Sequence, residues 1–323
     1  RGLLAEVRAL EAEAHQASLL PNPEFEFEAE NFGGTGETDG FDSAEITGGL
    51  SQEIQLGRKR AKRTRVAQLK ADSLQAELDS ATLELRIASD QKFVTLLEAQ
   101  SLRKLAQEDV RIANERLETM RLQLDAQKIS RLDVNKASIA LSTAQQKLRR
   151  LESESAKAAA DLSRLWGGDG TEIKTATGSL DASLSAPSWA QVQAAVARHP
   201  AVTKAQIDLA TNEADLDLAK AKGIPNIRLG GGIRELRDSD DTAAVLSFSI
   251  PLPLFDRNQG GIRAAEERVQ RAGSDRIGTK SNVSARYRRL HAEMMSARDR
   301  AKAFEAGIVA AARQSFEDMQ SAY

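Results

Sequence analysis

The acidic residues with the most regular spacing are Glu24, Glu26, Glu28 and Glu30, which alternate with apolar residues in the stretch PNPEFEFEAENF. A period of two puts all four carboxylates on one face of a strand and the apolar side chains on the other. Carboxylates arranged in this way can line a water-filled space, while the opposite face needs a protein core or lipid. The stretch therefore predicts a strand that separates water from an apolar environment.

No other group of residues forms a catalytic or ligand-binding pattern. The chain has no cysteine, and its three histidines, His15, His199 and His291, lie far apart with no metal-ligand spacing. The glycine-rich run from Leu229 to Arg234 lies in a strand pattern with no following helix, which makes it a poor phosphate loop. We therefore expect no enzyme activity, no cofactor and no dedicated metal site.

The composition is typical of long packed helices. Aromatic residues make up 4% of the 323 residues and charged residues 28%, which argues against a compact core of large side chains. The formal net charge is -2, and no basic stripe with interleaved aromatics occurs, so we expect no nucleic-acid partner. No apolar run approaches the roughly 20 residues of a membrane-spanning helix.

Two long helices joined by a narrow turn are predicted in the first half of the chain. Residues 58–126 contain no proline or glycine and carry apolar residues three and four apart, so they predict one helix roughly 100 Å long. Residues 132–165 keep a stricter heptad pattern with small residues, which favours close packing. The short polar turn between them makes a helical hairpin. From the helices alone, a free-standing coiled coil is an equal alternative.

The chain reads as an internal duplication with an offset of about 200 residues. Each copy has a helix, then two alternating runs separated by a polar turn, then a long helix. By the same offset, the second copy stops before its own helical tip. We assign residues 1–165 to the first repeat (β-hairpin 22–56, helical hairpin 58–165 with its tip near 126–132), 166–187 to a connector, and 188–323 to the second repeat (β-hairpin 226–254).

The two faces of these hairpins differ in polarity. A soluble sheet half-buried against a core would give the same pattern, but the flanking helices are already committed to their own seams. We predict that the polar face looks onto a water-filled lumen and the apolar face onto lipid. The predicted lumen residues are Glu24, Glu26, Glu28, Glu30, Glu45, Arg228 and Arg234, and the predicted lipid-facing residues are Phe25, Phe27, Ile46, Leu229, Leu246 and Phe248.

Four strands are too few to close a barrel. Open sheet edges are not tolerated in hydrocarbon, because their backbone groups have no partner there. Three copies would supply twelve strands, which is wide enough for a water-filled lumen. We therefore expect a homotrimer that contacts outer-membrane lipid.

The chain resembles the TolC family of trimeric outer-membrane channels over essentially its whole length. The resemblance lies in the duplicated plan, in the turn DAQKISRLDVNKA from Asp125 to Ala137, and in the segments SQEIQLGRKR and SIPLPLFDRNQGGI. The last two segments are similar to the CzcC-like heavy-metal branch. The family usually has a glycine where Gln127 stands here. The resemblance implies a mainly α fold with a small β part, in which long helical hairpins form an α-barrel and four strands per chain join a trimeric 12-stranded outer-membrane β-barrel.

The resemblance also implies a function. It implies a passive exit duct in a tripartite efflux system for heavy-metal cations of the cobalt, zinc, cadmium or copper type, driven by an inner-membrane proton-powered pump of the resistance-nodulation-division type. A periplasmic adaptor, or membrane fusion protein, would dock at the tip residues Gln127, Lys128, Ile129, Ser130, Arg131 and Leu132.

The implied location is the Gram-negative cell outer membrane, with helices extending into the periplasm. Two alternatives stay open. One is a channel for multidrug efflux or type I secretion, and the other is a periplasmic helical-hairpin adaptor or structural protein.

Overall fold

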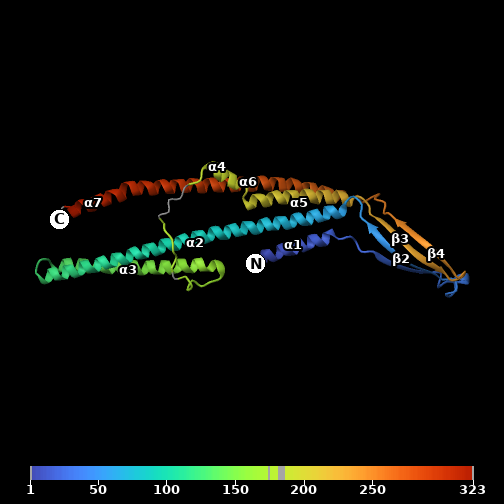
Figure 1. Cartoon of the computed structure of the whole chain (residues 1–323), viewed down its shortest axis with the longest axis horizontal. Helices are drawn as coiled ribbons and strands as arrows, with labels where there is room; N and C mark the ends of the chain where they lie inside the picture. Colours follow the sequence, from blue (N-terminus) through green and yellow to red (C-terminus); the bar gives the residue numbers. More distant parts are fainter. Residues whose placement is uncertain (1, 174, 181–185, 322–323) are drawn as a thin grey trace. The chain divides into compact units, whose positions relative to one another are not determined.

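The computed structural model describes residues 2–173, 175–180 and 186–321, and within them the chain is mainly helical with one four-stranded sheet (Figure 1). Contacts group the chain into two compact units, Arg1–Ser80 with Ala186–Tyr323, and Ala81–Ser185. This grouping follows packing rather than the sequence repeats, so the repeat boundaries stay a prediction. No helix in the described ranges is long and apolar enough to cross a membrane.

The helices of the first unit begin where local sequence signals place them. Ser188 caps the helix that follows it and forms a capping box with Gln191. Pro200 starts the next helix, because a residue without an N–H suits the first helical position. Both helices therefore begin at residues that suit a helix start. The helices are α1 (Gly2–Ser18), the start of α2 (Lys59–Asp125), α4 (Trp189–Ala197), α5 (Pro200–Lys222), α6 (Gln259–Phe304) and α7 (Ala310–Ser321).

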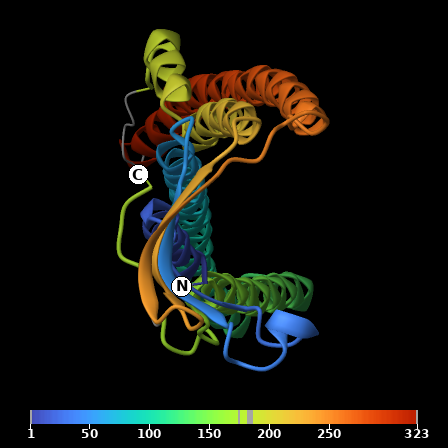
Figure 2. The same ribbon diagram turned by 90° about the vertical axis from the view of Figure 1, so that its right-hand side faces the viewer.

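Within this unit, α5 lies along α6, as both ribbon views show (Figures 1 and 2). The start of α2 is joined to α5 by polar contacts. The Lys204 amine lies 3.8 Å from the Glu77 carboxylate, and Ser73 donates a hydrogen bond to Asp208. On the other side, Arg63 Nε donates to the main-chain carbonyl of Ala17 in α1, at 3.0 Å. The helices therefore follow the order α1, α2, α5, α6.

The four predicted strands form one antiparallel sheet in the order β1-β2-β3-β4. The two hairpins of the duplication thus pair through β2 and β3, and β1 and β4 are the edges. Because the helices follow the same order, each edge strand belongs to the same repeat as the helix at that edge. The strands are β1 (Glu24–Glu30), β2 (Glu45–Ile54), β3 (Ile227–Leu236) and β4 (Asp241–Ser249).

Equivalent backbone geometry at matching positions supports the duplication. The residue before α2 is Arg58 and the residue before α6 is Asn258, and both have a φ of 58°. Each carbonyl then accepts the first helical bond, from Lys62 at 3.0 Å and from Ile262 at 2.9 Å. Beyond Phe304 the second copy departs from the first, because a π-helical turn at Glu305–Val309 interrupts the helix. The sequence pattern did not predict this turn.

The second unit is the helical hairpin of α2 and α3 (Arg131–Ser163). Small and branched side chains pack between the two helices, as the heptad pattern predicts. Two ion pairs tie the helices together, Lys147 to Asp109 at 2.9 Å and Lys92 to Asp161 at 3.5 Å. The connector after α3 has no strand in its described part, and residues 174 and 181–185 lie outside the described residues. The core consists of Leu96, Ala99, Ala158, Ala159 and Leu162, with Leu165, Ile173 and Ala176 packed against it.

Glycines let β2 and β3 approach closely in the middle of the sheet. Gly49 lies opposite Gly232. A Cβ on Gly232 would lie 2.5 Å from the Gly48 carbonyl oxygen and 2.9 Å from the Gly49 Cα. A Cβ on Gly231 would meet nothing closer than 3.9 Å. The backbones of the two hairpins therefore pack against each other only where the polar face carries no side chain.

We expect Gly232→Ala to lower the free energy of unfolding by about 1–3 kcal/mol, because the new methyl group clashes with backbone rather than with a movable side chain. Gly231→Ala is the matched control, and it should change stability by less than about 1 kcal/mol. Urea unfolding of both variants in the same lipid or detergent measures the difference. Equal stability of the two variants would contradict the close approach.

Candidate functional site

The sheet has one polar and one apolar face, and the register assigns every predicted face residue as expected. Glu28 lies opposite Thr47, which lies opposite Arg234, so these three share a face. Phe25 lies opposite Leu50 on the other face, in line with Leu246 across β3. The structure therefore brings all seven predicted lumen residues to one face and all six predicted lipid-facing residues to the other.

Two arginines of β3 reach across the polar face to the acids of β1 and β2. Arg228 Nη1 lies 2.8 Å from Glu24 and 3.8 Å from Glu26. Arg234 forms a second group of ion pairs nearer the sheet's loops, at 2.7 Å to Glu45 and 3.3 Å to Glu30, and its Nε donates to Thr47 at 2.9 Å. Each guanidinium spans three strands, so the ion pairs tie the two hairpins together as well as setting the charge of this face.

The acids outnumber the arginines on this face. Among the described residues, the Glu28 carboxylate has no ion-pair partner, and a small hollow of about 90 Å³ opens beside it over the glycines of β2 and β3. The face therefore has an excess of negative charge. A wet space lined in this way attracts cations and repels anions.

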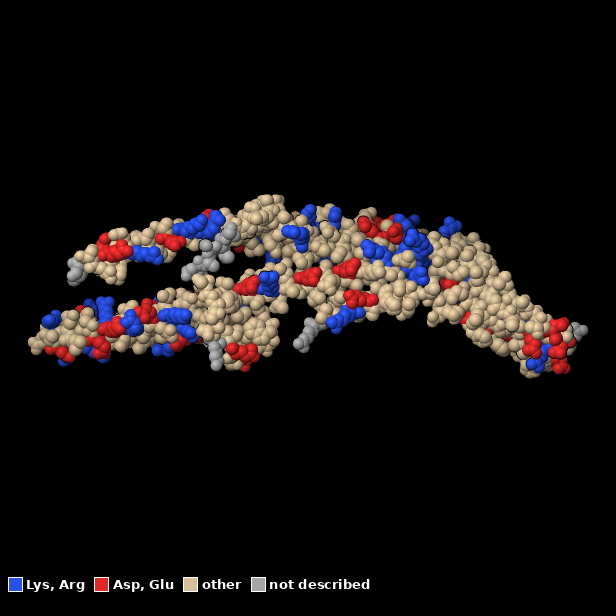
Figure 3. All heavy atoms as spheres, viewed as in Figure 1, with Lys and Arg blue, Asp and Glu red and all other residues tan. Residues whose placement is uncertain are grey.

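The apolar face is not covered by any helix of the described chain. The exposed fraction is 72% for Phe25, 66% for Phe27 and 87% for Leu246. Figure 3 shows this side of the sheet as a surface almost free of charge, with acidic residues gathered at its far end. Exposure of this extent favours a partner outside the chain, such as lipid, over a soluble sheet half-buried against its own helices.

A polar junction fixes the ends of the strands to the helices. The Lys59 amine donates to Asn226 Oδ1 at 2.6 Å and to the main-chain carbonyl of Ile224, and the Asn226 amide donates to Glu53. Burial lowers the pKa of the Lys59 amine, and the Glu53 carboxylate opposes that shift. The junction joins β2 and α2 of the first repeat to α5 and β3 of the second.

The predicted docking turn lies where α2 passes into α3. Four of its six residues, Gln127 to Ser130, lie between the two helices, and Arg131 and Leu132 are the first residues of α3. The N–H of Lys128 donates to the Gln123 carbonyl and the N–H of Gln127 donates to the Leu124 carbonyl, both at 2.8 Å, which is the Schellman pattern of a helix C-terminus. Within the turn, only Ile129 is half-buried. The turn is therefore ordered by its own backbone, while its polar side chains are left exposed.

The first turn of α3 is held by a capping box. The backbone N–H and the hydroxyl of Ser130 both donate to Asp133, at 3.2 and 2.7 Å. The Ser130 hydroxyl, and then the Ser130 N–H, lower the pKa of the Asp133 carboxyl. A lowered pKa stabilises the folded turn at neutral pH, and that contribution is lost as the pH falls through the folded pKa.

The backbone of Gln127 adopts a left-handed conformation, with a φ of 58°. A Schellman turn needs this conformation at the residue after the helix, and glycine adopts it without strain. The glycine that the resemblance implies at this position would therefore have a physical reason. In this chain the turn keeps its geometry with a strained glutamine in place of the glycine.

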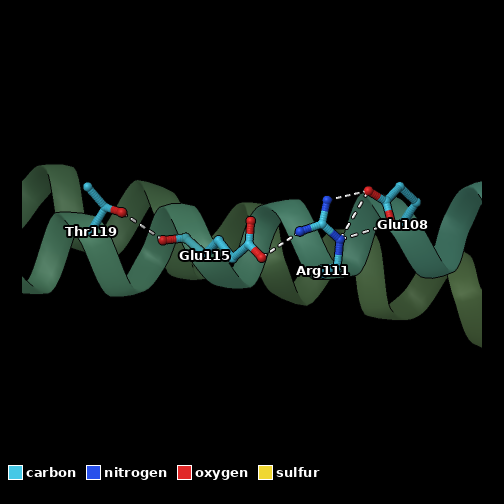
Figure 4. Close-up of polar contacts among 4 residues, drawn as sticks. All are labelled: Glu108, Arg111, Glu115 and Thr119. Atoms are coloured by element: carbon cyan, nitrogen blue, oxygen red, sulfur yellow. Dashed lines mark hydrogen bonds and ion pairs between the residues drawn. The ribbon is translucent and has the colours of Figure 1, made fainter.

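Other charged and aromatic clusters are structural rather than chemical. On α2, Arg111 bridges Glu108 and Glu115, and the Thr119 hydroxyl donates to the Glu115 carbonyl at 2.9 Å (Figure 4). The hydrogen bond from Arg111 lowers the pKa of Glu108. Because these groups are fully exposed, such pairs add little to stability.

Two histidines for which the sequence indicates no function pack against aromatic rings in the first unit. His291 accompanies Trp189, with ring centroids 5.9 Å apart, and its Nε2 lies 2.9 Å from the Pro187 carbonyl oxygen. His199 accepts the N–H of Ala201 at the start of α5. No group of three or more His, Cys, Asp or Glu side chains in the described chain could hold a metal ion.

We expect Gln127→Gly to raise the free energy of unfolding of the hairpin by about 0.5–1 kcal/mol, because relief of left-handed strain exceeds the entropy that glycine adds to the unfolded chain. Lys128→Gly is the control, since Lys128 has no positive φ and only the entropic loss applies. Urea unfolding followed by helicity compares the two. A destabilised Gln127→Gly variant would show that the side chain, rather than the backbone, holds the turn.

Comparison with known proteins agrees with this arrangement. The family model described as "Outer membrane efflux protein" matches residues 3–168 and 191–323. The cobalt-zinc-cadmium resistance protein CzcC of Cupriavidus metallidurans is 25% identical over 96% of this chain and 73% of its own length. The nickel-cobalt-cadmium resistance protein NccC of Alcaligenes xylosoxydans xylosoxydans is 28% identical over 87% of this chain. The chain spans 64% of that second relative, which is just under two thirds.

Solved structures show the same fold. A crystal structure of CusC has a TM-score of 0.73 and 17% identity, and the match covers 99% of this chain and 78% of CusC. The outer membrane protein VceC of Vibrio cholerae has a TM-score of 0.70 and 16% identity, over 96% of this chain and 79% of VceC. With a family model that matches most of its length and a sheet and helical hairpin of the same architecture, the chain belongs to the outer membrane efflux protein family.

Proposed function

We propose that the chain forms the outer-membrane channel of a tripartite, proton-driven efflux system and serves as a passive exit duct for heavy-metal cations. Family membership gives an efflux role in the Gram-negative outer membrane. The observation that carries the channel is the four-stranded sheet with a charged face, an uncovered apolar face and two free edges. Its polar face suits water and its apolar face suits lipid.

The free edges support a trimer. Within the part of the chain that the structure describes, β1 has a partner only on its β2 side and β4 only on its β3 side, so each presents unpaired N–H and C=O groups. In hydrocarbon those groups need partners from another chain. Pairing of β1 with β4 of the next copy closes a ring without changing any strand, and three copies give the twelve-stranded barrel. Mass measurement in detergent should then give three protomers.

The face assignments follow from this closure. We place the seven predicted lumen residues, among them Glu28 and Arg234, in the lumen, and the six predicted lipid-facing residues, among them Phe27 and Leu246, against lipid. The charge of the lumen supports cations as the substrate class, since an excess of carboxylates lowers the barrier for positive ions.

The relatives support heavy-metal cations over drugs. CzcC is named for cobalt, zinc and cadmium resistance and NccC for nickel, cobalt and cadmium resistance. Multidrug or type I secretion channels remain the second candidate, because solved structures such as VceC share the fold. A wide wet duct needs no dedicated metal ligands and no catalytic group, so we assign the chain no enzyme activity and place substrate selection in the pump.

The hairpin turn supports an adaptor as partner. The six residues Gln127 to Leu132 expose polar groups that the hairpin itself does not need, while the backbone and the Ser130–Asp133 cap hold the turn in one shape. A rigid, polar tip suits docking to a second protein. We propose that a periplasmic adaptor binds there and connects the channel to an inner-membrane pump of the resistance-nodulation-division type.

Phe27→Arg should lower the free energy of unfolding in vesicles by about 2–4 kcal/mol, because it places a charge on the lipid face. Glu28→Arg, one residue further along β1, should fold normally and reduce conductance for cations, since it reverses charge in the lumen. Urea unfolding in vesicles and single-channel recording compare the two. Equal losses of stability would argue for a sheet with both faces packed against protein.

Loss of the chain from its native host should sensitise growth to cobalt, zinc, cadmium or nickel salts but not to antibiotics or dyes. A panel of growth inhibition assays, with the deletion complemented by the full-length protein, measures this. The reverse result, sensitivity to drugs with unchanged metal tolerance, would support the multidrug alternative.

The combined change Lys128→Glu and Arg131→Glu should abolish metal resistance while trimer assembly and membrane insertion stay intact. Both side chains are exposed in the turn, and neither takes part in the Ser130–Asp133 cap. Ser130→Ala is the control for the fold of the turn, because it removes a capping hydroxyl without changing charge. Resistance that persists in the double variant would place adaptor contact elsewhere on the helices.

A further inference from the structure

A dense basic segment begins at the junction between the sheet and the helices. Between Gln55 and Ala71 the chain has seven cationic residues and no acidic one. An unbalanced run of this length requires a counter-charge from outside its own segment. The seven residues are Arg58, Lys59, Arg60, Lys62, Arg63, Arg65 and Lys70.

Three of these cations are engaged within the protein. Lys59 donates to Ile224 and Asn226 as described above, and Lys62 donates to the Asp217 carbonyl at 3.1 Å. Arg63 donates to the main-chain carbonyls of Ala17 and Leu19 at the end of α1. In contrast, the exposed side chains of Arg58, Arg60 and Arg65 make no ion pair or hydrogen bond with the described part of the chain. The fold therefore presents three guanidinium groups to solvent next to the sheet.

Two of these arginines line a groove between the start of α2 and the end of α5. The groove has a volume of about 250 Å³ and is lined by Arg58, Lys62 and Arg65, with Asp217 as its acidic residue. Lys62 binds the main-chain carbonyl of Asp217 rather than its carboxylate. Three cations against one acid leave the groove positive, and guanidinium groups bind phosphate oxygens in a bidentate manner.

An exposed apolar segment lies near the basic groove. The linker from β4 to α6 exposes 72% of Leu252 and 90% of Phe255. This linker meets the end of α5, because a Cβ on Gly223 would lie 2.6 Å from the Arg257 carbonyl oxygen. The start of α2 meets the same place, since a Cβ on Gly57 would lie 2.7 Å from Ile224. The basic groove and the apolar linker therefore border one junction.

We propose that this junction binds the headgroup phosphates of anionic phospholipids in the periplasmic leaflet of the outer membrane. Arg58, Arg60 and Arg65 contact the phosphates, and Leu252 and Phe255 enter the interface beside them. The inference rests on the proposed function in one respect, that the apolar sheet face lies in lipid. Basic residues next to a bilayer surface attract anionic lipids.

Continuity with the sheet argues for lipid as the occupant. Strands β2 and β4, which carry part of the uncovered apolar face, end at Ile54 and Ser249, just before the basic and apolar segments begin. Figure 3 shows Lys and Arg gathered over the helix ends beside the uncharged side of the sheet. In a membrane-inserted sheet, the polar headgroups lie where the apolar face stops, which is the level of these arginines.

The test reconstitutes the full-length channel into two sets of vesicles, one of phosphatidylcholine alone and one with phosphatidylglycerol added. Lipid retained by the detergent-extracted protein is then counted by native mass spectrometry. The wild type should retain phosphatidylglycerol over phosphatidylcholine. The combined change Arg58→Gln, Arg60→Gln and Arg65→Gln should reduce this preference about tenfold, and the same three positions changed to Lys should keep most of it.

The matched control removes three exposed arginines of α6 and α7 instead, Arg276→Gln, Arg286→Gln and Arg313→Gln, and should behave as wild type. An unchanged preference in the Arg58, Arg60 and Arg65 variant would overturn the proposal, and so would an equal loss in the control. If this variant lost the trimer but kept the lipid preference, the arginines would contact a neighbouring copy of the chain and not lipid, which would also overturn the proposal. If inorganic phosphate displaced the retained lipid as effectively as added phosphatidylglycerol does, the groove would be a general anion site and not a lipid site. Failure to insert into either vesicle would count against the channel itself, which separates the two hypotheses.

Discussion

The rest of the structure depends on one constraint, that backbone N–H and C=O groups need partners wherever water is absent. Strands β2 and β3 satisfy it within the chain, but β1 and β4 each leave one edge unpaired. The predicted duplication makes the two edges complementary, because β1 corresponds to β3 and β4 corresponds to β2, and β2 and β3 already pair within the chain. A head-to-tail arrangement of copies therefore satisfies every edge with one kind of contact, and it does so with no change inside the sheet.

The same constraint explains why the centre of the sheet is rich in glycine and its polar face is rich in long charged side chains. The two hairpins come from distant parts of the chain and must pair closely between β2 and β3, where Gly49 faces Gly232. On either side of that point, Arg228 and Arg234 reach across β2 and bind acids on β1 and β2. Backbone pairing and side-chain ion pairs thus hold the hairpins together.

Where the strands end and the helices begin, the side chains change from apolar to basic within a few residues. The junction uses Lys59 to satisfy a carbonyl and an amide left free by the change of direction, at the cost of partly burying an amine. Its neighbours Arg58, Arg60 and Arg65 are not needed for that purpose. The hairpin turn at the other end of α2 shows a similar separation, because its backbone and the Ser130–Asp133 cap fix its shape while Lys128 and Arg131 are left available.

The sequence by itself determined which residues share a face and where the long helices run, and it predicted an internal duplication. These features follow from local periodicity, because a strand repeats every two residues and a helix every 3.6. The uninterrupted run from Lys59 to Asp125 could be predicted for the same reason. The charged face of β1 could be predicted as well, although its assignment to a lumen stays a proposal.

Only the tertiary structure decided which distant residues meet. The pairing of β2 with β3, the reach of Arg228 to Glu24, the contact of Lys59 with Asn226 and the groove of Arg58, Lys62 and Arg65 all join residues far apart in sequence. The left-handed backbone at Gln127 was hidden for a different reason, because glutamine carries no signal for that conformation. Periodicity reports which way a side chain points from its own strand or helix, and it contains no information on what the rest of the fold places opposite.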